Sequence, residues 1–290
     1  MQHMPASFFD ENPTGDLMAM AINDIGAVRM TAGMVVSQLL TGAGAAGPAL
    51  EGAVSRSGMR AEPGAVCRVR IGADNRLRCE TIGGAAPLGI CGSGIVDMIA
   101  EGYLAGWISG DGTLDPDASP QIQTVWEEKS GRNVPAIVYA MSPNGPLSFT
   151  QDDIAEFVRC KAAAFTMVQT LMEAAGVSLD EVGTFYLSGG FGTHLDLESA
   201  VTIGMYPDMD RDHIINAGNS SLEGAQKILL NRSLLTDIDQ ILEEMVYSQF
   251  AEVEDFLELM TAAQALPHTD YKRYPTVMEE LKERQKDRKL

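Results

Sequence analysis

Three glycine-rich turns constrain the fold of this chain more than any other feature. Each lies where an expected strand ends and an expected helix begins, and the richest is "TFYLSGGFGTHLD" at 184–196. The glycines of these turns are Gly189, Gly190 and Gly192; Gly92 and Gly94; and Gly218. Glycine at such a point either makes a tight turn or lets a ligand approach the backbone closely. Strands that alternate with helices predict an α/β fold with a mostly parallel or mixed central sheet.

The composition limits the partners and the location of the protein. A formal net charge of −19 argues against nucleic acids and anionic membranes, because both are negatively charged. No apolar run reaches the roughly 18 residues that a membrane span needs. The first residues also lack the basic and apolar segments of a signal peptide. We therefore expect a cytoplasmic protein that binds neither nucleic acid nor membrane.

The cysteines do not indicate a metal centre. The chain has four of them, at Cys67, Cys79, Cys91 and Cys160, without a CxxC pair. Iron–sulfur clusters are usually held by closely grouped cysteines, so we expect no cluster in this chain. Cys67 and Cys79 could face each other across a hairpin, but no metal site is predicted.

The first part of the chain, up to residue 177, is expected to contain several strands and two helices. Residues 17–40 predict a strand, a turn and a strand, and 65–72 with 76–84 predict a hairpin. Residues 87–108 lead from a glycine turn into a helix for which Ser93 is a plausible N-cap. A loop or insertion is expected at 109–134 and a strand at 135–141. The clearest helix covers 148–177, with Thr150 as its cap and Gly176 at its end.

The second half repeats the strand–turn–helix order. The expected elements are a strand at 184–190, a short helix at 197–205, a strand and helix within 212–231, and an acidic helical region at 234–263, before a charged end that should fray. We therefore divide the chain into a ragged N-terminus (1–16), one lobe (17–233) with an insertion (109–147), and a helical C-terminal extension of the same domain (234–290).

The glycine turns favour a nucleotide site. Ligands of open α/β sheets bind at the carboxyl ends of strands, and the following helix offers free N–H groups. The chain has no Gly-Lys-Ser/Thr loop, and no GxGxxG turn follows a first strand with a partnering acid, so the two commonest nucleotide folds are disfavoured. Gly92, Ser93 and Gly94 either line the cleft or only begin a helix.

A family resemblance rests on motifs in a fixed order. These are "DIG" (24–26), "AAGPALEGA" (45–53), "GMRA" (58–61), "GICGSGIVD" (89–97), "LSGGFGTHLDLESAVTIGMYP" (187–207), "GNSSLEGA" (218–225) and "LPHTD…YP" (266–275). The set resembles the C-terminal domain of the ATP-dependent reductive activators of corrinoid proteins, which belong to the superfamily of actin, sugar kinases and heat-shock ATPases. The resemblance covers about residues 20 to 276, and it implies a ribonuclease-H-like lobe with a mixed central sheet flanked by helices.

The resemblance implies a function and a set of ligand contacts. Such activators use ATP, with Mg, to drive an electron from an iron–sulfur domain to a cob(II)alamin protein, which returns to the cob(I) state in a methyltransferase system. A corrinoid protein or its methyltransferase is the implied partner. The implied adenosine turn is Ser188, Gly189, Gly190 and Gly192; the helix start that closes the site is Gly218, Asn219 and Ser220; and the implied phosphate loop contains Asp24 and Gly26.

Two departures from the family pattern support an alternative. The Asp-Ile-Gly loop continues here with "AVRM" where the family has Thr-Asn-Gly-Glu, and the iron–sulfur domain, linker and first phosphate loop do not precede it in this sequence. The alternative is a non-catalytic module of the same fold, which docks a corrinoid protein or methyltransferase, or forms a homodimer. Activators of acyl-CoA dehydratases hold a cluster with cysteines that have no match here.

Four further polar residues, three of them within these motifs, are interpreted structurally. We expect Lys161 to be a solvated lysine on its helix, and His194 to be exposed after the glycine turn. His268 should tie down the C-terminal segment, and Glu51 should lie at a helix end.

Overall fold

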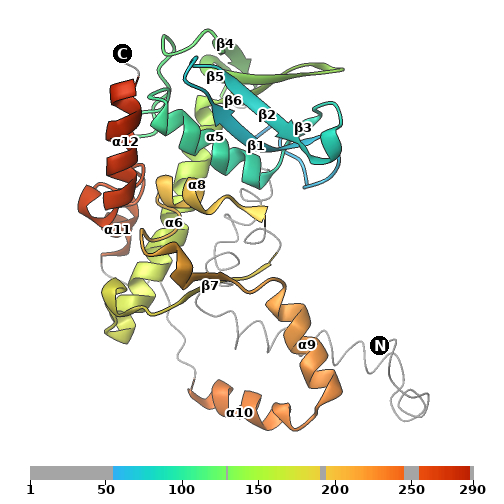
Figure 1. The fold of residues 1–290 in the computed structure, drawn as a ribbon, viewed down its shortest axis with the longest axis vertical. Coiled ribbons are helices and arrows are strands. Elements are labelled where there is room, and N and C mark those ends of the chain that lie inside the picture. Colours follow the sequence, from blue (N-terminus) through green and yellow to red (C-terminus); the bar gives the residue numbers. More distant parts are fainter. Residues whose placement is uncertain (1–54, 129, 190–193, 245–254, 288–290) are drawn as a thin grey trace, which may run out of the picture.

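The computed structural model describes residues 55–128, 130–189, 194–244 and 255–287. The strands expected at 17–40, the "DIG" and "AAGPALEGA" motifs, and Glu51 lie outside these residues. Within them the α/β class is confirmed, and the strands form two three-stranded sheets and one two-stranded sheet. Figure 1 shows the two larger sheets at one end of the molecule, with α9 and α10 at the other.

The first sheet contains the expected hairpin. Strands β1 (Ala65–Ile71) and β2 (Leu77–Thr81) pair antiparallel, and β3 (Gly89–Ile90) pairs parallel to β1 on its other side. This sheet is therefore mixed, as predicted. A turn between β1 and β2 places Asn75 at φ 57°, a left-handed conformation that asparagine tolerates. A short 3₁₀ turn, η2 (Ile82–Gly84), follows β2.

Helix α5 (Gly92–Leu104) is buried along its whole length under this sheet. The prediction that Ser93 caps it is wrong. Cys91 occupies the N-cap position without a side-chain hydrogen bond, because Gly92 is already helical. A Cβ at Gly94 would lie 2.3 Å from the carbonyl oxygen of Val66, so glycine allows helix and strand to touch.

The second sheet corrects the loop expected at 109–134. Strand β4 (Ile122–Glu127) lies within that segment and pairs antiparallel with β5 (Arg132–Ser142), which pairs with β6 (Gly145–Thr150). The sequence did not predict β4 because most of its outward-facing residues are polar. Its aromatic residue, Trp126, does not belong to the core either, because it is 61% exposed. The strand expected at 135–141 is confirmed as part of β5, but β6 occupies residues that were assigned to the following helix.

Helix α6 (Gln151–Ala175) connects the two ends of the molecule (Figure 1). Its predicted start is confirmed: the Thr150 hydroxyl accepts from the N–H of Asp153, and the Asp153 carboxylate accepts from the N–H of Thr150. Its predicted end is also confirmed, with Gly176 in a left-handed conformation at φ 67°. The capping box and the glycine stop are strong local signals, which explains why this helix was predictable.

The remaining elements follow the predicted order. Strands β7 (Phe185–Leu187) and β8 (Ile214–Asn216) pair parallel, with α8 (Leu197–Thr202) between them in the chain. The later helices are α9 (Ser220–Leu230), α10 (Leu234–Glu244), α11 (Phe256–Ala262) and α12 (Pro275–Asp287); the short 3₁₀ turns are η3 (Leu179–Glu181), η4 (Arg211–His213) and η6 (Tyr271–Arg273).

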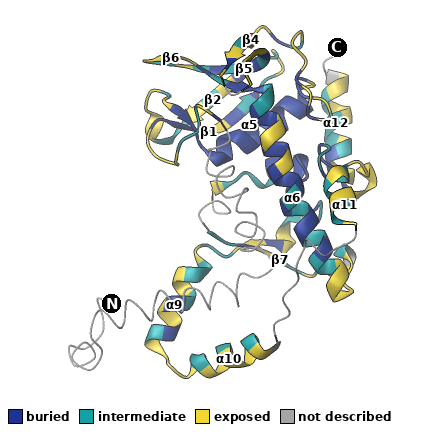
Figure 2. Cartoon of the chain, turned by 180° about the vertical axis from the view of Figure 1, so that it is seen from behind, coloured by how far each residue is buried: buried dark blue, intermediate teal, exposed yellow. Residues whose placement is uncertain are grey.

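The charged end of the chain does not fray as expected within the described residues. Helix α12 continues to Asp287 because Arg284 bonds Glu280 one turn away and Glu101 on α5. Figure 2 shows that α5 is buried, whereas α9 and α10 are half-buried or exposed along most of their length. None of the helices in the described ranges has the length and apolarity to cross a bilayer.

Lys161 corrects another expectation, because it is buried and not solvated. Its side chain is 1% exposed, and its Nζ donates to the carbonyl oxygens of Ala263 at 2.6 Å, Ala265 at 2.9 Å and Pro267 at 2.6 Å. Burial lowers the pKa of Lys161 to about 7. Three acceptors nevertheless favour the ammonium form, because a neutral amine has only two N–H groups. Lys161 thus fixes the segment after α11 to α6.

His268 ties down the same segment, as predicted. It is 5% exposed, its Nδ1 accepts from the N–H of Asp270 at 2.9 Å, and its ring packs against Phe165 with centroids 5.3 Å apart. His194 is exposed, also as predicted.

Candidate functional site

Two of the three glycine turns meet at the carboxyl ends of β7 and β8. The N–H of Gly189 donates to the carbonyl oxygen of Gly218 at 2.7 Å, and the N–H of Ala217 donates to that of Leu187, also at 2.7 Å. Gly189 has φ +91° and Gly218 has φ +63°, and a Cβ at either would have nothing within 4 Å. The two turns therefore require glycine for their backbone conformation, and within the described residues no atom crowds either Cβ position.

The start of α9 adds polar groups beside these turns. Asn219 caps the helix, since its Oδ1 accepts from the N–H of Leu222 at 3.1 Å, and Ser220 is the first helical residue. Asn216, which sequence reasoning missed, accepts from the N–H of Gly218 at 2.9 Å and stabilises the turn. The sequence did carry a signal for this role, because an asparagine two residues before a glycine is typical of a turn in which the asparagine side chain bonds the backbone.

The third turn has a different position and explanation. Gly92, Ser93 and Gly94 are buried at the start of α5. Gly94 is explained by its contact with β1, and the Ser93 hydroxyl lies 3.3 Å from the Cys91 sulfur. The structure thus brings Ser188 and Gly189 together with Gly218, Asn219 and Ser220. The predicted contacts of Asp24, Gly26, Gly190 and Gly192 fall outside the described residues.

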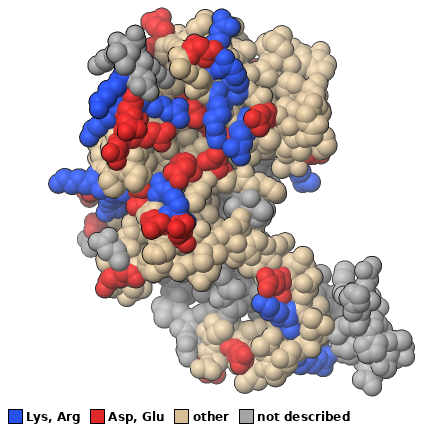
Figure 3. Space-filling model, in the orientation of Figure 1, with Lys and Arg blue, Asp and Glu red and all other residues tan. Residues whose placement is uncertain are grey.

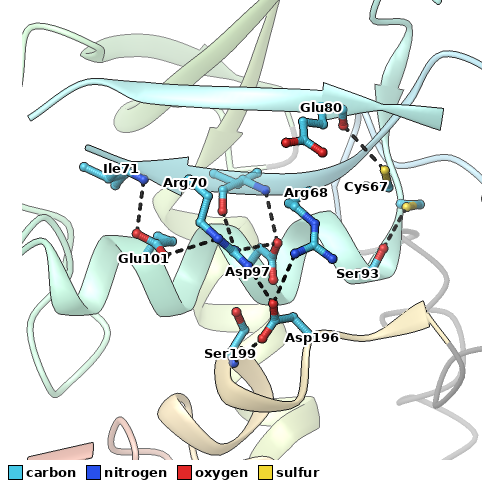
Figure 4. A network of polar contacts seen from close by, with 12 residues as sticks. Cys67, Arg68, Arg70, Ile71, Glu80, Ser93, Asp97, Glu101, Asp196 and Ser199 are labelled. Atoms are coloured by element: carbon cyan, nitrogen blue, oxygen red, sulfur yellow. Dashed lines mark hydrogen bonds and ion pairs between the residues drawn. The ribbon is translucent and has the colours of Figure 1, made fainter. Parts of the chain in front are cut away.

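A network of charges joins α5 to β1 (Figure 4). Asp97 accepts from the N–H of Val69 at 3.1 Å, and Glu101 accepts from the N–H of Ile71 at 3.1 Å. In the described residues β3 pairs only with the first two residues of β1, so these carboxylates supply the acceptors that a longer β3 would provide. Burial raises the pKa of Asp97, although the Val69 N–H and Arg70 oppose that shift.

The same network holds Asp196, the last residue of the glycine motif. Arg70 donates to Asp97 at 2.9 Å and to Asp196 at 2.6 Å (Figure 4). Asp196 also caps α8 by accepting from the N–H of Ser199 at 3.1 Å. Burial works against ionisation of Asp196, but Ser199 and Arg70 hold its pKa below the usual value. Arg68 also donates to Asp196 at 3.4 Å, so two arginines of β1 fix the end of the glycine motif to the body of the protein.

The sequence contained a signal for this network. Asp97 and Asp196 each end one of the two glycine motifs, "GICGSGIVD" and "SGGFGTHLD", and neither was assigned a role. Arg70 lies in a strand whose charged residues alternate with apolar ones. That pattern is typical of a strand with one solvent-exposed face, so it did not indicate a role for Arg70. Figure 3 shows how such charges of both signs gather over the upper part of the molecule.

The described residues contain no group of three or more histidine, cysteine or acidic residues that could hold a metal ion. The four cysteines are free thiols, and Cys67 bonds the carbonyl oxygen of Glu80 across the hairpin while Cys79 bonds that of Tyr139. At the β7–β8 edge the described residues present backbone groups, an asparagine and a serine, which are able to hydrogen-bond to a polar ligand.

Comparison with known proteins gives three informative matches. The family model described as the C-terminal domain of RACo, the ASKHA domain, matches residues 22–278. The corrinoid activation enzyme RamQ of Eubacterium limosum is 34% identical over 198 residues, which are 65% of this chain and 32% of that protein. The [Co(II) methylated amine-specific corrinoid protein] reductase of Methanosarcina barkeri is 25% identical over 251 residues, 77% of this chain and 41% of that protein.

A solved structure agrees with these matches. The reductive activator for corrinoid, iron–sulfur protein superposes with a TM-score of 0.71 and 34% sequence identity, over 79% of this chain and 36% of that chain. This chain therefore spans between about a third and two fifths of the length of these relatives.

Proposed function

Because the chain belongs to the family of the C-terminal ASKHA domain of RACo, we propose that it is the nucleotide-binding part of a reductive activator of corrinoid proteins. Its substrate complex would be ATP with Mg²⁺, and its partner a corrinoid protein or the methyltransferase that such a protein serves. The electron would come from an iron–sulfur domain outside the described residues.

The observation that carries the proposal is the meeting of Gly189 and Gly218. Their hydrogen bond places two left-handed glycines side by side at the carboxyl ends of parallel strands, where α/β proteins bind nucleotides. Ser188, Asn219 and Ser220 surround these glycines and would hold the adenosine. The phosphates and Mg²⁺ would lie toward Asp24 and Gly26, which are outside the described part of the chain.

Bound ATP supplies the free energy that makes the reduction of cobalt possible. The role of this chain is to convert ATP binding into a conformational change, because a ligand that binds one conformation more tightly shifts the equilibrium toward that conformation. Arg70 is suited to transmit such a shift, because it joins Asp196 after the glycine turn to Asp97 on α5. A docked corrinoid protein would then experience nucleotide binding as a change in its contact surface.

A second function is favoured by the "AVRM" continuation of the Asp-Ile-Gly loop. It lacks the hydroxyl, amide and carboxylate that would meet phosphate and metal. The alternative is a docking module that binds a corrinoid protein, or a second copy of itself, without ATP hydrolysis.

Titration with Mg-ATP tests the proposal, followed by calorimetry and by the thermal unfolding midpoint. A ligand that binds the native state must raise its stability, so a midpoint that is unchanged at millimolar Mg-ATP would refute nucleotide binding. In that case, binding of a corrinoid protein irrespective of nucleotide would support the docking module.

A matched pair of variants locates the site. Gly218→Leu and Gly176→Leu both place a side chain at a left-handed glycine, with φ +63° and φ +67°, where nothing lies within 4 Å of the new Cβ. The two should lose similar stability, about 1–2 kcal/mol. Only Gly218→Leu should weaken Mg-ATP binding, by more than 10-fold; equal binding by both variants would place the nucleotide elsewhere.

A further inference from the structure

The register of β7 and β8, which carry two of the glycine turns, is not determined by their apolar pattern. Each strand has 3 residues, "FYL" and "IIN", and the described residues add no third strand to this sheet. Ile214 is buried, whereas Ile215 is 43% exposed opposite Tyr186, which is 54% exposed. A shift of β8 by one residue would bury Ile215 in place of Ile214, so hydrophobic burial specifies the register weakly. A pair of short strands also has little stability of its own.

The position of β8 decides the geometry of the candidate site. The N–H of Gly189 donates to the carbonyl oxygen of Gly218, and the N–H of Ala217 donates to β7 in the same way. A displaced β8 would break both bonds and would move Asn219, at the start of α9, with it. Apolar packing is non-directional, so a contact of fixed direction is needed to hold β8 in this register.

Arg211 provides such a contact immediately before β8. It is the first residue of η4, which runs directly into Ile214. Its guanidinium group donates to both carboxylate oxygens of Glu198 on α8 at 2.9 Å, to one of Asp208 at 2.9 Å, and to the carbonyl oxygen of Met209 at 2.6 Å. Two parallel bonds from one guanidinium group to one carboxylate fix direction as well as distance.

The start of α12 completes this contact. The Asp208 side chain is 1% exposed, and it accepts from the N–H of Thr276 at 2.9 Å and from the Thr276 hydroxyl at 2.7 Å. The same hydroxyl accepts from Arg211 at 3.1 Å. Asp208 thus has the charged and hydrogen-bonding partners that a buried carboxylate requires. We call Glu198, Asp208, Arg211 and Thr276 the C-terminal clamp.

We infer that the C-terminal clamp positions the nucleotide site, and that the start of α12 thereby controls the affinity of that site. Arg211 and Asp208 are positioning residues, because they act on β8, and through it on Gly218 and Asn219, and not on the ligand. The ligand in this inference rests on the proposed function, whereas the link between α12 and β8 does not. Coupling of this kind is reciprocal, so a bound nucleotide should in turn stabilise the clamp.

A matched pair of arginine variants tests the link in the absence of nucleotide. Arg211→Gln breaks the clamp, whereas Arg284→Gln removes an arginine that joins the same helix to Glu101 on α5. The two arginine side chains are similarly exposed, at 25% and 33%. Hydrogen exchange of the Gly189 and Ala217 amides, followed by NMR, reports opening of the ladder. Arg211→Gln should speed this exchange at least about 10-fold, and Arg284→Gln less than about 2-fold.

A milder variant keeps the test decisive if Arg211→Gln does not fold. Thr276→Val retains the shape of the side chain and the N–H bond to Asp208 but removes the hydroxyl, so it should speed the same exchange to a lesser extent. Thr276→Ser restores the hydroxyl and should behave as the wild type.

Calorimetry with Mg-ATP tests control of the site. At a temperature well below the unfolding midpoints of both variants, the dissociation constant should rise at least about 5-fold in Arg211→Gln and stay unchanged in Arg284→Gln. A residue that only adds to global stability would not produce this difference. In the wild type, saturating Mg-ATP should slow exchange of the Thr276 amide.

Three results would overturn the inference. Equal exchange at Gly189 and Ala217 in the two arginine variants would mean that the clamp does not hold the ladder. Equal Mg-ATP affinity in these variants, or a Thr276 amide that does not respond to bound nucleotide, would remove control of the site and leave the proposed function standing. A wild type that binds no Mg-ATP would refute the proposed function and with it the control of affinity, whereas the link between α12 and β8 would still be decided by the exchange measurement.

Discussion

Replacing Lys161 by methionine should destabilise the protein strongly, although the residue contacts no ligand. Methionine matches the length of the lysine stem but cannot donate to the carbonyl oxygens of Ala263, Ala265 and Pro267. Each buried carbonyl that loses its donor costs about 1–3 kcal/mol. Removal of a buried cation that has no ion pair in the described residues offsets part of this cost. We expect the free energy of unfolding to fall by about 2–4 kcal/mol.

Urea unfolding followed by circular dichroism measures this change. The midpoint should fall while the slope with urea stays constant, since the surface exposed on unfolding is similar. Lys227→Met is the matched control, because the Lys227 side chain is 65% exposed and, among the residues that the structure describes, its one ion pair is with Glu223 on its own helix. That control should change stability by less than about 0.5 kcal/mol. A loss below about 1 kcal/mol for Lys161→Met would refute the view that the carbonyl cage holds this segment.

Three other substitutions test separate features of the fold. A Cβ at Gly204 (φ +72°) would lie 2.0 Å from the carbonyl oxygen of Pro267. Gly204→Ala should therefore lower the free energy of unfolding, measured with urea, by about 3 kcal/mol. The control Gly131→Ala has a similar φ of +63° but no described atom within 4 Å of the new Cβ, so it should lower that free energy by about 1 kcal/mol. Thr150→Ala should cost about 1 kcal/mol by loss of the N-cap, and Thr150→Ser should restore it. Burial lowers the pKa of His268 to about 4 in the folded protein, whereas in the unfolded chain the same imidazole keeps its ordinary pKa of about 6.5. Between these two pH values the unfolded chain binds a proton that the folded protein does not bind. Stability should therefore fall between pH 6.5 and 4, and less so in His268→Asn, whose Oδ1 can accept the same bond; identical thermal midpoints against pH for both proteins would contradict this.

Local signals made much of the fold predictable. The capping box at Thr150, the left-handed Gly176 and the apolar runs of β7 and β8 each act within a few residues, so sequence alone located α6 and the strand–turn–helix units. Strand β4 was not predictable in the same way, because its outward residues are polar and only its pairing with β5 makes it a strand. Ser93 was misplaced for a related reason: a serine near a helix start is a good cap only if the preceding glycine is not yet helical.

The site was predictable as a set of turns but not as a set of contacts. The glycine pattern indicated the turns at 188–189 and 218–220, and their hydrogen bond follows from the parallel pairing of β7 with β8. Asp196, one partner of Arg70, lies 126 residues away in the sequence, and the carbonyl cage of Lys161 lies between 102 and 106 residues away. No local pattern in the sequence encodes such distances, so Lys161 looked like an ordinary surface lysine.

The long reach of these charges bears on how the protein is made. Translation delivers the chain in order, and the early part of a protein can collapse before the rest exists. Here Glu101 finds Arg284 only 183 residues later, and Lys161 finds its carbonyl cage only after residue 267 has left the ribosome. Until then the Lys161 ammonium group lacks the acceptors that permit its burial, whereas Glu101 already has the N–H of Ile71 and the guanidinium group of Arg70. The nascent chain should therefore keep α6 loosely packed until the segment from 263 to 267 emerges.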